Sequence, residues 1–233
     1  MTADWHQFDR AYCISLEERA DRRQEAKAQF VKVGLLEKVE FVVVSKHATD
    51  CEQGIYESHL LCMHKGLAAG ARTILIFEDD ICFDGYKPHL LDRCARFMAA
   101  APWRILFLGC MVKRSRATNH PSIRQVRYRS LTHAYVIERS FAQVLVQQYP
   151  WRRVPYDDFL RDLNDDQFFA IYPMFAFQSN SRSDNERYLP LDRFRRLCGG
   201  LVRLQKSNEF YHRFQWPIIF AHVLALILLM MAL

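Results

Sequence analysis

Short apolar runs alternate with amphipathic segments along most of the chain. Runs rich in β-branched and aromatic residues predict strands, at Ala11–Leu16, Phe41–Lys46, Thr73–Phe77, Arg104–Cys110, Val126–Arg129, Thr132–Glu138 and Phe168–Tyr172. Segments in which apolar residues recur every three or four positions predict helices, at Glu18–Val33, Glu57–Ala69, Pro88–Ala101, Ser140–Tyr149 and Asp157–Leu163. Because strands and helices alternate, we predict an α/β fold, with a mixed, mostly parallel sheet covered by helices on both faces.

One predicted strand ends in three acidic residues. Thr73–Phe77 has the composition of a buried strand, and Glu78, Asp79 and Asp80 follow it directly. These carboxylates must lie where the strand leaves the sheet, which in open α/β sheets is the edge where ligands bind. Adjacent carboxylates repel each other unless a cation lies between them, so a divalent metal ion is the expected occupant. The alternative is a solvated acidic turn, but apolar residues resume at once in Ile81–Phe83.

The end of the chain is apolar. Pro217–Leu233 carries no charge, and the segment before it is rich in arginine and lysine. This length is at the short limit for a membrane-spanning helix, and basic residues beside it favour a membrane surface. We therefore expect a catalytic-type domain over residues 1–188, a basic linker or amphipathic helix over 189–213, and a membrane-anchor helix over 214–233. The positive-inside rule then places the domain on the cytoplasmic face of the membrane. A core helix docked on the domain is the alternative.

Composition narrows the class of partner. The net charge of +6 fits an anionic partner, such as a nucleotide, a phosphorylated lipid, a membrane surface or a nucleic acid. Basic residues are not interleaved with aromatic ones as in RNA-binding motifs, so we expect no nucleic-acid partner. The seven cysteines form no CxxC pair, which favours reduced thiols in a cytosolic setting over a disulfide framework or a zinc site. The first residues lack the apolar region of a signal peptide.

Familiar catalytic motifs are absent, and three other polar segments attract attention. The chain contains no GxGxxG, GxxxxGK[ST] or GxSxG motif, which gives no support to a dinucleotide, P-loop or hydrolase site. The turn Ser15–Arg23 contains a hydroxyl group, several arginines and a helix N-terminus, which together favour binding of a diphosphate. The alternative is an ordinary charged first turn of a helix. His59 lies near the start of a predicted helix, and we expect it either to contact a ligand or to pack against the rest of the protein. Asp157 and Asp158 follow a proline and suit general-base work or helix capping.

Taken in order, these segments resemble glycosyltransferase family 25, the lipopolysaccharide and procollagen galactosyltransferase-like family. The resemblance covers about residues 10–185. It is carried by Ala11-Tyr12-Cys13-Ile14-Ser15-Leu16 with Asp21-Arg22-Arg23, Gly54 with Ser58-His59, Ile76-Phe77-Glu78-Asp79-Asp80, Leu108-Gly109-Cys110, Thr132-His133-Ala134-Tyr135-Val136-Ile137, Pro155-Tyr156-Asp157, and Pro173 with Gln178 and Ser183. Each piece is weak alone, and the ordered set is specific.

The resemblance implies a GT-A-type, Rossmann-like fold and transfer of a hexose from a nucleotide sugar, with UDP-galactose the expected donor. It implies Mn²⁺ (or Mg²⁺) as cofactor and a glycan or glycolipid acceptor, as in lipopolysaccharide or cell-surface glycan synthesis. Glycosyl transfer requires the departing diphosphate to be neutralised, and a divalent ion held by carboxylates does this.

The resemblance also assigns roles to individual residues. Asp79 and Asp80 are expected to bind the metal ion, and Asp157, with Asp80, to be catalytic, Asp157 as the base that activates the acceptor hydroxyl. His133 is expected to be a third metal ligand or a donor contact. The donor-binding residues are expected to be Ser15, Leu16, Arg22, Ser58, His59, Glu78, Asp79, His133 and Gln178.

Two features depart from the family pattern. The segment from Ser45 to Gly54 is brief, and the apolar tail is not a general family feature. The tail suggests a lipid-linked or membrane-surface acceptor. Two other functions stay open: a catalytically inactive GT-A-like binding or scaffold module at the membrane, and a tail-anchored, metal-dependent phosphoesterase.

Overall fold

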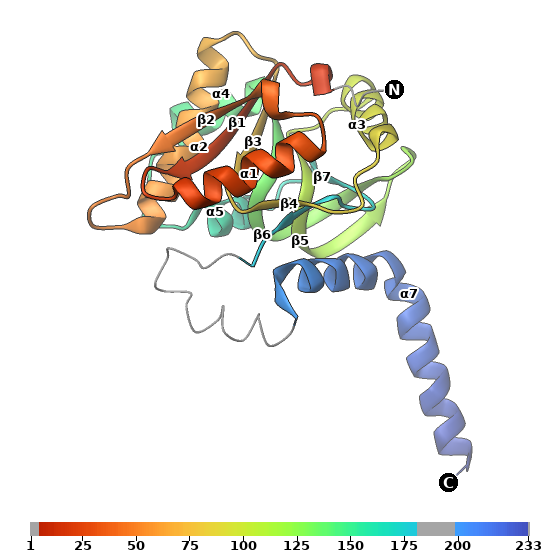
Figure 1. The fold of residues 1–233 in the computed structure, drawn as a ribbon. Helices are drawn as coiled ribbons and strands as arrows, with labels where there is room; N and C mark the ends of the chain where they lie inside the picture. The colour runs from red at the N-terminus through yellow and green to blue at the C-terminus, as the bar shows by residue number, and fades with distance from the viewer. Residues whose placement is uncertain (1–4, 181–198, 233) are drawn as a thin grey trace.

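A six-stranded mixed sheet forms the centre of the protein (Figure 1). The computed structural model describes residues 5–180 and 199–232. The strand order is β2 (Val39–Val44), β1 (Arg10–Leu16), β3 (Thr73–Glu78), β6 (Ile123–Glu138), β5 (Ile105–Ala117) and β7 (Phe168–Ile171). β1 is parallel to β2 and β3, β5 is parallel to β7, and β6 runs antiparallel to its neighbours. The predicted mixed, mostly parallel sheet is therefore confirmed.

Helices cover both faces of this sheet. α1 (Ala20–Lys32) and α3 (Pro88–Ala100) contribute to the core on one face, and α2 (Cys51–Ala68), α4 (Arg139–Gln148) and α5 (Tyr156–Leu163) contribute to the core on the other. Successive side chains of a strand point to opposite faces. In β3, Phe77 belongs to the core that contains Phe30 of α1, and Ile76 to the core that contains Met63 of α2. Short 3-10 turns lie at Trp5–Gln7 and Leu36–Lys38.

A small second sheet, which the sequence did not predict, lies beside the acidic end of β3. β4 (Ile81–Phe83) pairs antiparallel with β8 (Ala176–Gln178), so that Ile81 lies opposite Gln178. β8 crosses close to Gly109 of β5, where an added Cβ would lie 1.6 Å from the Ala176 carbonyl oxygen. Only glycine permits this approach. The small sheet therefore holds Gln178 next to the acidic segment.

Two boundaries differ from the prediction. The predicted strand Arg104–Cys110 is longer than expected, because β5 continues through the polar stretch that follows it as far as Ala117, and β6 already begins at Ile123. The added residues of β5 are mostly polar because this part of the strand extends beyond the core, so the alternation of apolar residues that marks a strand is missing. The two strands predicted over 126–138 are one strand, β6, interrupted at Leu131, whose φ is 74°.

Helix α2 begins at Cys51, earlier than the predicted Glu57. The side chain of Asp50 caps it by accepting hydrogen bonds from the N–H groups of Glu52 and Gln53, at 3.0 and 3.3 Å. The sequence does not predict this earlier start because Gly54, a poor helix former, lies within the first turn. A Cβ at Gly54 would lie 2.9 Å from the Cβ of His47. The glycine therefore lets the loop before the helix approach its first turn.

The chain ends in α7 (Gly200–Ala232), which has two different halves (Figure 1). The backbone is not helical at Phe214, and Pro217, which follows, cannot donate a helical hydrogen bond. Before this break the helix packs on the domain, and after it the apolar side chains are exposed. By length and composition alone, α7 could cross a membrane. The expected apolar C-terminal helix is thus present, and the basic segment before it is helical from Gly200. Ser183 and residues 189–198 lie outside the described residues.

Candidate active site

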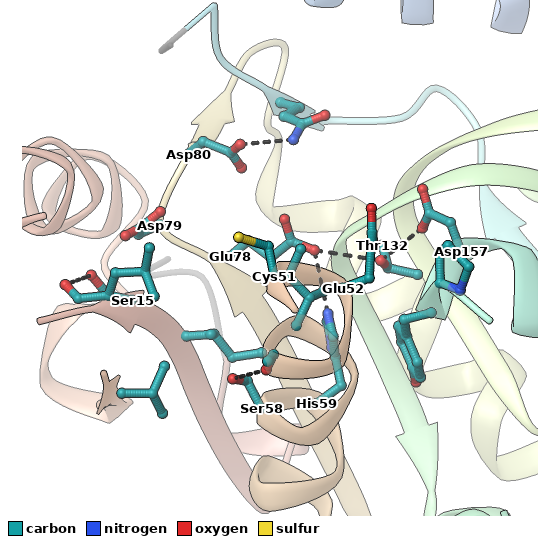
Figure 2. A pocket seen from close by; sticks show the side chains of 18 of the residues that line it. Ser15, Cys51, Glu52, Ser58, His59, Glu78, Asp79, Asp80, Thr132 and Asp157 are labelled. Atoms are coloured by element: carbon teal, nitrogen blue, oxygen red, sulfur yellow. Dashed lines mark hydrogen bonds and ion pairs between the residues drawn. The ribbon is translucent and has the colours of Figure 1, made fainter. Parts of the chain in front are cut away.

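A cavity of about 370 Å³ opens at the carboxyl ends of β1, β2 and β3 (Figure 2). This size is typical of a small-molecule site. α2, α5 and β6 form its other walls, and Leu201 of α7 lies at its edge. Apart from His133, every site residue expected from the sequence lines it, namely Ser15, Leu16, Arg22, Ser58, His59, Glu78, Asp79, Asp80, Asp157 and Gln178.

Arg22, in the first turn of α1, contacts both aspartates of the acidic segment. Its Nε is 3.1 Å from Asp79 Oδ1, and its Nη2 is 2.6 Å from Asp80 Oδ2. Both aspartates are almost fully buried. Burial raises the pKa of Asp79 to about 6, because loss of hydration outweighs the attraction of Arg22. One guanidinium thus faces two carboxylates, and burial makes the ionised form of Asp79 costly.

The carboxylate of Asp80 has one occupied and one free oxygen. Oδ2 contacts Arg22 and accepts a hydrogen bond of 2.7 Å from Gln178 Nε2. Oδ1 is buried and has no hydrogen-bond partner among the described residues. A buried carboxylate oxygen without a partner is costly. A cation at Oδ1 would remove that cost.

His59 connects the acidic segment to a buried aromatic cluster. Its Nε2 is 3.3 Å from Glu78 Oε1, its Nδ1 is 3.0 Å from the hydroxyl of Tyr135, and its ring stacks on Tyr156. Burial lowers the pKa of His59 to about 3, so the ring is neutral near pH 7. Burial, reinforced by nearby carboxylates, raises the pKa of Glu78. His59 thus packs as a wall of the cavity and also contacts an acid within it.

Asp157, in the first turn of α5, is held by three donors. Its Oδ1 accepts from the hydroxyls of Tyr128 and Thr132, and its Oδ2 accepts from the Leu131 N–H at 2.9 Å. A carboxylate has about four acceptor positions, so one position remains, on Oδ2. The left-handed backbone of Leu131 belongs to this arrangement. Thr132 Oγ1 also lies 3.4 Å from Glu78 Oε1. Sequence reasoning assigns no role to Thr132 or Tyr128, because common hydroxyl residues carry no distinctive pattern.

His133 does not reach the cavity. Its side chain is fully buried, and Nε2 lies 3.1 Å from the Ala176 carbonyl oxygen of β8. Thr132, its neighbour, points into the cavity, and successive residues of a strand point to opposite faces. The expectation that His133 binds metal or donor is therefore wrong in this geometry.

The charges around the cavity favour a bound cation. The acids are Glu52, Glu78, Asp79, Asp80, Asp157 and Asp158, and the bases are Arg22 and Lys46. A diphosphate would meet a net negative wall unless a cation accompanied it. Over residues 5–180 and 199–232, no group of three or more acidic, histidine or cysteine side chains could hold a metal ion by itself. Divalent ions in phosphate-processing sites commonly take one or two carboxylates and complete their shell with water and phosphate oxygens. Asp79 and Asp80 fit a site of that kind.

Comparisons with known proteins give a consistent picture. The model of glycosyltransferase family 25 (LPS biosynthesis protein) matches residues 37–160. A human protein, inactive glycosyltransferase 25 family member 3, is 25% identical over an alignment of 185 residues that covers 66% of this chain and 31% of that protein. A bovine protein, probable inactive glycosyltransferase 25 family member 3, is 24% identical over an alignment of 226 residues that covers 77% of this chain and 38% of that protein. The chain thus spans about a third of the length of these relatives. Among solved structures, A197 from STIV has a TM-score of 0.49 and 12% identity, over 72% of this chain and 85% of that one.

Proposed function

This chain belongs to glycosyltransferase family 25, and from that premise we propose that it transfers a hexose from a UDP-sugar to a saccharide or lipid-linked acceptor with the help of a divalent metal ion. One observation carries the proposal: Arg22, the acidic segment Glu78–Asp80 and Asp157 converge on one cavity at the carboxyl edge of the sheet. We expect galactose as the sugar, in lipopolysaccharide or cell-surface glycan synthesis.

In this proposal the donor lies along the ends of β1 and β3. Ser15 and Leu16 offer main-chain groups to the nucleotide, and Arg22 offers its guanidinium to the diphosphate. His59 and Ser58 form the wall beside the sugar, because they face the cavity from α2.

Asp80, through its free Oδ1, and Asp79 would hold Mn²⁺ or Mg²⁺, and such an ion when bound neutralises charge on the departing diphosphate. Asp157 would accept the proton of the acceptor hydroxyl at the remaining position on Oδ2. That hydroxyl oxygen then bonds to the anomeric carbon as the bond from this carbon to the diphosphate oxygen breaks. The configuration at the anomeric carbon is thereby inverted.

The test is release of UDP by the purified full chain with a panel of nucleotide sugars. We expect release with one UDP-hexose in Mn²⁺ and its loss in EDTA. Release from no donor, with UDP still bound, would instead support the inactive module. Hydrolysis of simple phosphate esters would favour the phosphoesterase.

The inactive binding module is the second candidate, and one contact favours it. Arg22 contacts both aspartates expected to bind metal, so a nucleotide could bind beside the guanidinium without an ion. The names of the human and bovine relatives also describe inactive proteins. UDP binding that is equally tight with and without Mn²⁺ would support this candidate.

We also propose that the exposed half of α7 anchors the domain to the cytoplasmic face of a membrane. Residues 214–232 extend roughly 28 Å at 1.5 Å per residue, close to the ~30 Å of a bilayer core. Deleting Gln215–Leu233 should move the protein from the membrane fraction to the soluble fraction in cell fractionation. If the full-length protein is already soluble, the anchor proposal fails.

A further inference from the structure

The first half of α7 binds the domain through polar side chains that contact main-chain groups. Asn208 Oδ1 accepts from the Val112 N–H at 2.9 Å, and its Nδ2 donates to the Val112 carbonyl at 3.1 Å. Glu209 Oε2 accepts from the Met174 N–H at 3.2 Å. Asn208 thus binds the main chain of β5 beyond Ile105–Phe107, the part that pairs with β7, and Glu209 binds the segment that leads into β8.

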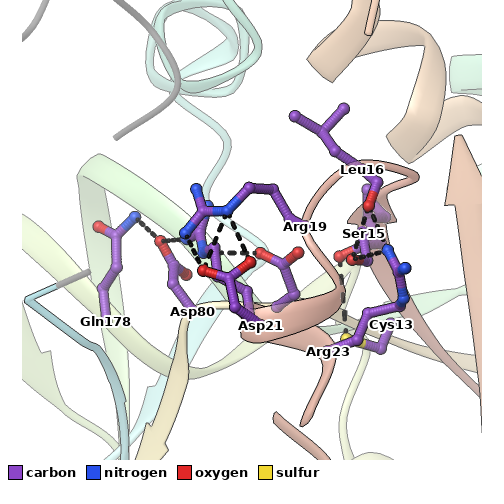
Figure 3. Close-up of polar contacts among 11 residues, drawn as sticks. Cys13, Ser15, Leu16, Arg19, Asp21, Arg23, Asp80 and Gln178 are labelled. Atoms are coloured by element: carbon purple, nitrogen blue, oxygen red, sulfur yellow. Dashed lines mark hydrogen bonds and ion pairs between the residues drawn. The ribbon is translucent and has the colours of Figure 1, made fainter. Parts of the chain in front are cut away.

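Gln205 makes the corresponding contact with β8. Its side chain is fully buried, and its Oε1 accepts from the Gln178 N–H at 2.9 Å. The side chain of Gln178 in turn donates to Asp80 Oδ2 at 2.7 Å (Figure 3). A short path of hydrogen bonds therefore runs from α7, through one residue of β8, to a carboxylate of the cavity.

The rim of the cavity is tied to the same helix at a second point. Leu201 lines the cavity, and its N–H donates to Asn180 Oδ1 at 2.8 Å. The neighbouring Ser179 N–H donates to the carbonyl of Asp80 at 2.7 Å. The side chain and the main-chain carbonyl of Asp80 are therefore held by Gln178 and by Ser179, and Ser179 lies between the two residues that α7 contacts, Gln178 and Asn180.

We propose that Gln205 is a positioning residue for the donor site: by fixing β8 it sets Gln178 against Asp80, and so orients the carboxylate that would bind the metal ion. This inference rests on the proposed function. According to this proposal, the half of α7 that packs on the domain belongs to the donor site. The apolar half after Phe214 does not belong to it.

Three variants distinguish an effect of Gln205 on the orientation of Asp80 from an effect on the stability of the whole protein. Gln205→Leu removes the acceptor for Gln178, and Gln205→Glu keeps an oxygen there. Asn208→Leu is the matched control, because it breaks a comparable contact of the same helix that has no link to Asp80. The readouts are Mn²⁺ binding in the presence of UDP, followed by electron paramagnetic resonance, and hydrogen exchange of the amides of β4 and β8.

We expect Gln205→Leu to weaken Mn²⁺ binding about tenfold, which is the effect typical of losing a residue that orients a metal ligand. Amide exchange in β4 and β8 should rise in the same variant. Asn208→Leu should lower the melting temperature but leave Mn²⁺ binding within about twofold of wild type. Gln205→Glu keeps the acceptor for the Gln178 N–H, so its Mn²⁺ binding should stay closer to wild type than that of Gln205→Leu, while its buried carboxyl group should lower the melting temperature. Equal losses of Mn²⁺ binding in Gln205→Leu and Asn208→Leu would overturn the proposal.

Gln178→Met covers the case in which Gln205→Leu does not fold. It removes the donor to Asp80 but keeps the N–H that Gln205 accepts, so Mn²⁺ binding should fall while the melting temperature changes little. Unchanged Mn²⁺ binding in this variant would contradict the proposal. If the wild-type chain binds neither Mn²⁺ nor UDP, the proposed function fails, and hydrogen exchange of β8 in the folded Gln205 variants still decides whether α7 holds this strand.

Discussion

Replacing Asp79 and Asp80 together by alanine should reduce UDP release by about a thousandfold or more, because removing groups that stabilise charge in a transition state has effects of this order or larger. The two carboxylates lie at the edge where the sheet ends, and Asp80 keeps a buried oxygen free for a cation. Without them the departing diphosphate has only Arg22 and Lys46 as positive charges among the described residues that line the cavity. The measurement is the initial rate of UDP release at saturating Mn²⁺.

The control is Asp84→Ala, the same replacement a few residues further along the chain. Asp84 is half-exposed, lies outside the cavity lining and pairs with Lys206. Exposed ion pairs contribute little to stability, about 0–1 kcal/mol, so this variant should release UDP at the wild-type rate. Release that survives the double replacement at wild-type level would reject the site assigned here.

The sequence predicts the sheet and most of the site for a physical reason. The central strands are covered by helices on both faces, so their sequences are uninterrupted apolar runs such as Thr73–Phe77. Where such a run stops, the chain has reached the edge of the sheet, and residues after several strands meet there. This is why Leu16, after β1, and Asp80, after β3, line one cavity although they are far apart in the sequence.

What the sequence does not predict depends on contacts between distant segments. Three-residue strands such as β4 and β8 are too short to show a periodic pattern, and their place depends on the missing Cβ of Gly109. Gln205 looked like part of a basic linker, because nothing local shows that its side chain is buried against β8. For His133, the alternation along β6 implies that it and Thr132 face opposite sides, but it does not tell which of the two faces the cavity.

Asp157→Asn should lower the transfer rate by about 10²–10⁴-fold, the usual contribution of a general base. Mn²⁺ dependence and the KM for the donor should change little, because Asp157 does not contact Asp79, Asp80 or Arg22 through any hydrogen bond or ion pair among the described residues. The amide cannot accept a proton at the position left free on Oδ2. The measurement is kcat for transfer to an acceptor, compared with slow UDP release when no acceptor is present, which should persist.

Thr132→Val provides the matched control for this prediction. It removes one of the two donors to Asp157 Oδ1 but leaves Oδ2 and its contact with Leu131 intact. We expect a loss of less than about tenfold, since one neutral hydrogen bond contributes roughly 0.5–1.5 kcal/mol. Asp157→Asn also leaves buried donors without an acceptor, so its melting temperature must be measured alongside. If the asparagine variant transfers sugar at the wild-type rate, the base lies elsewhere. If it instead loses UDP binding, Asp157 supports the shape of the cavity rather than the chemistry.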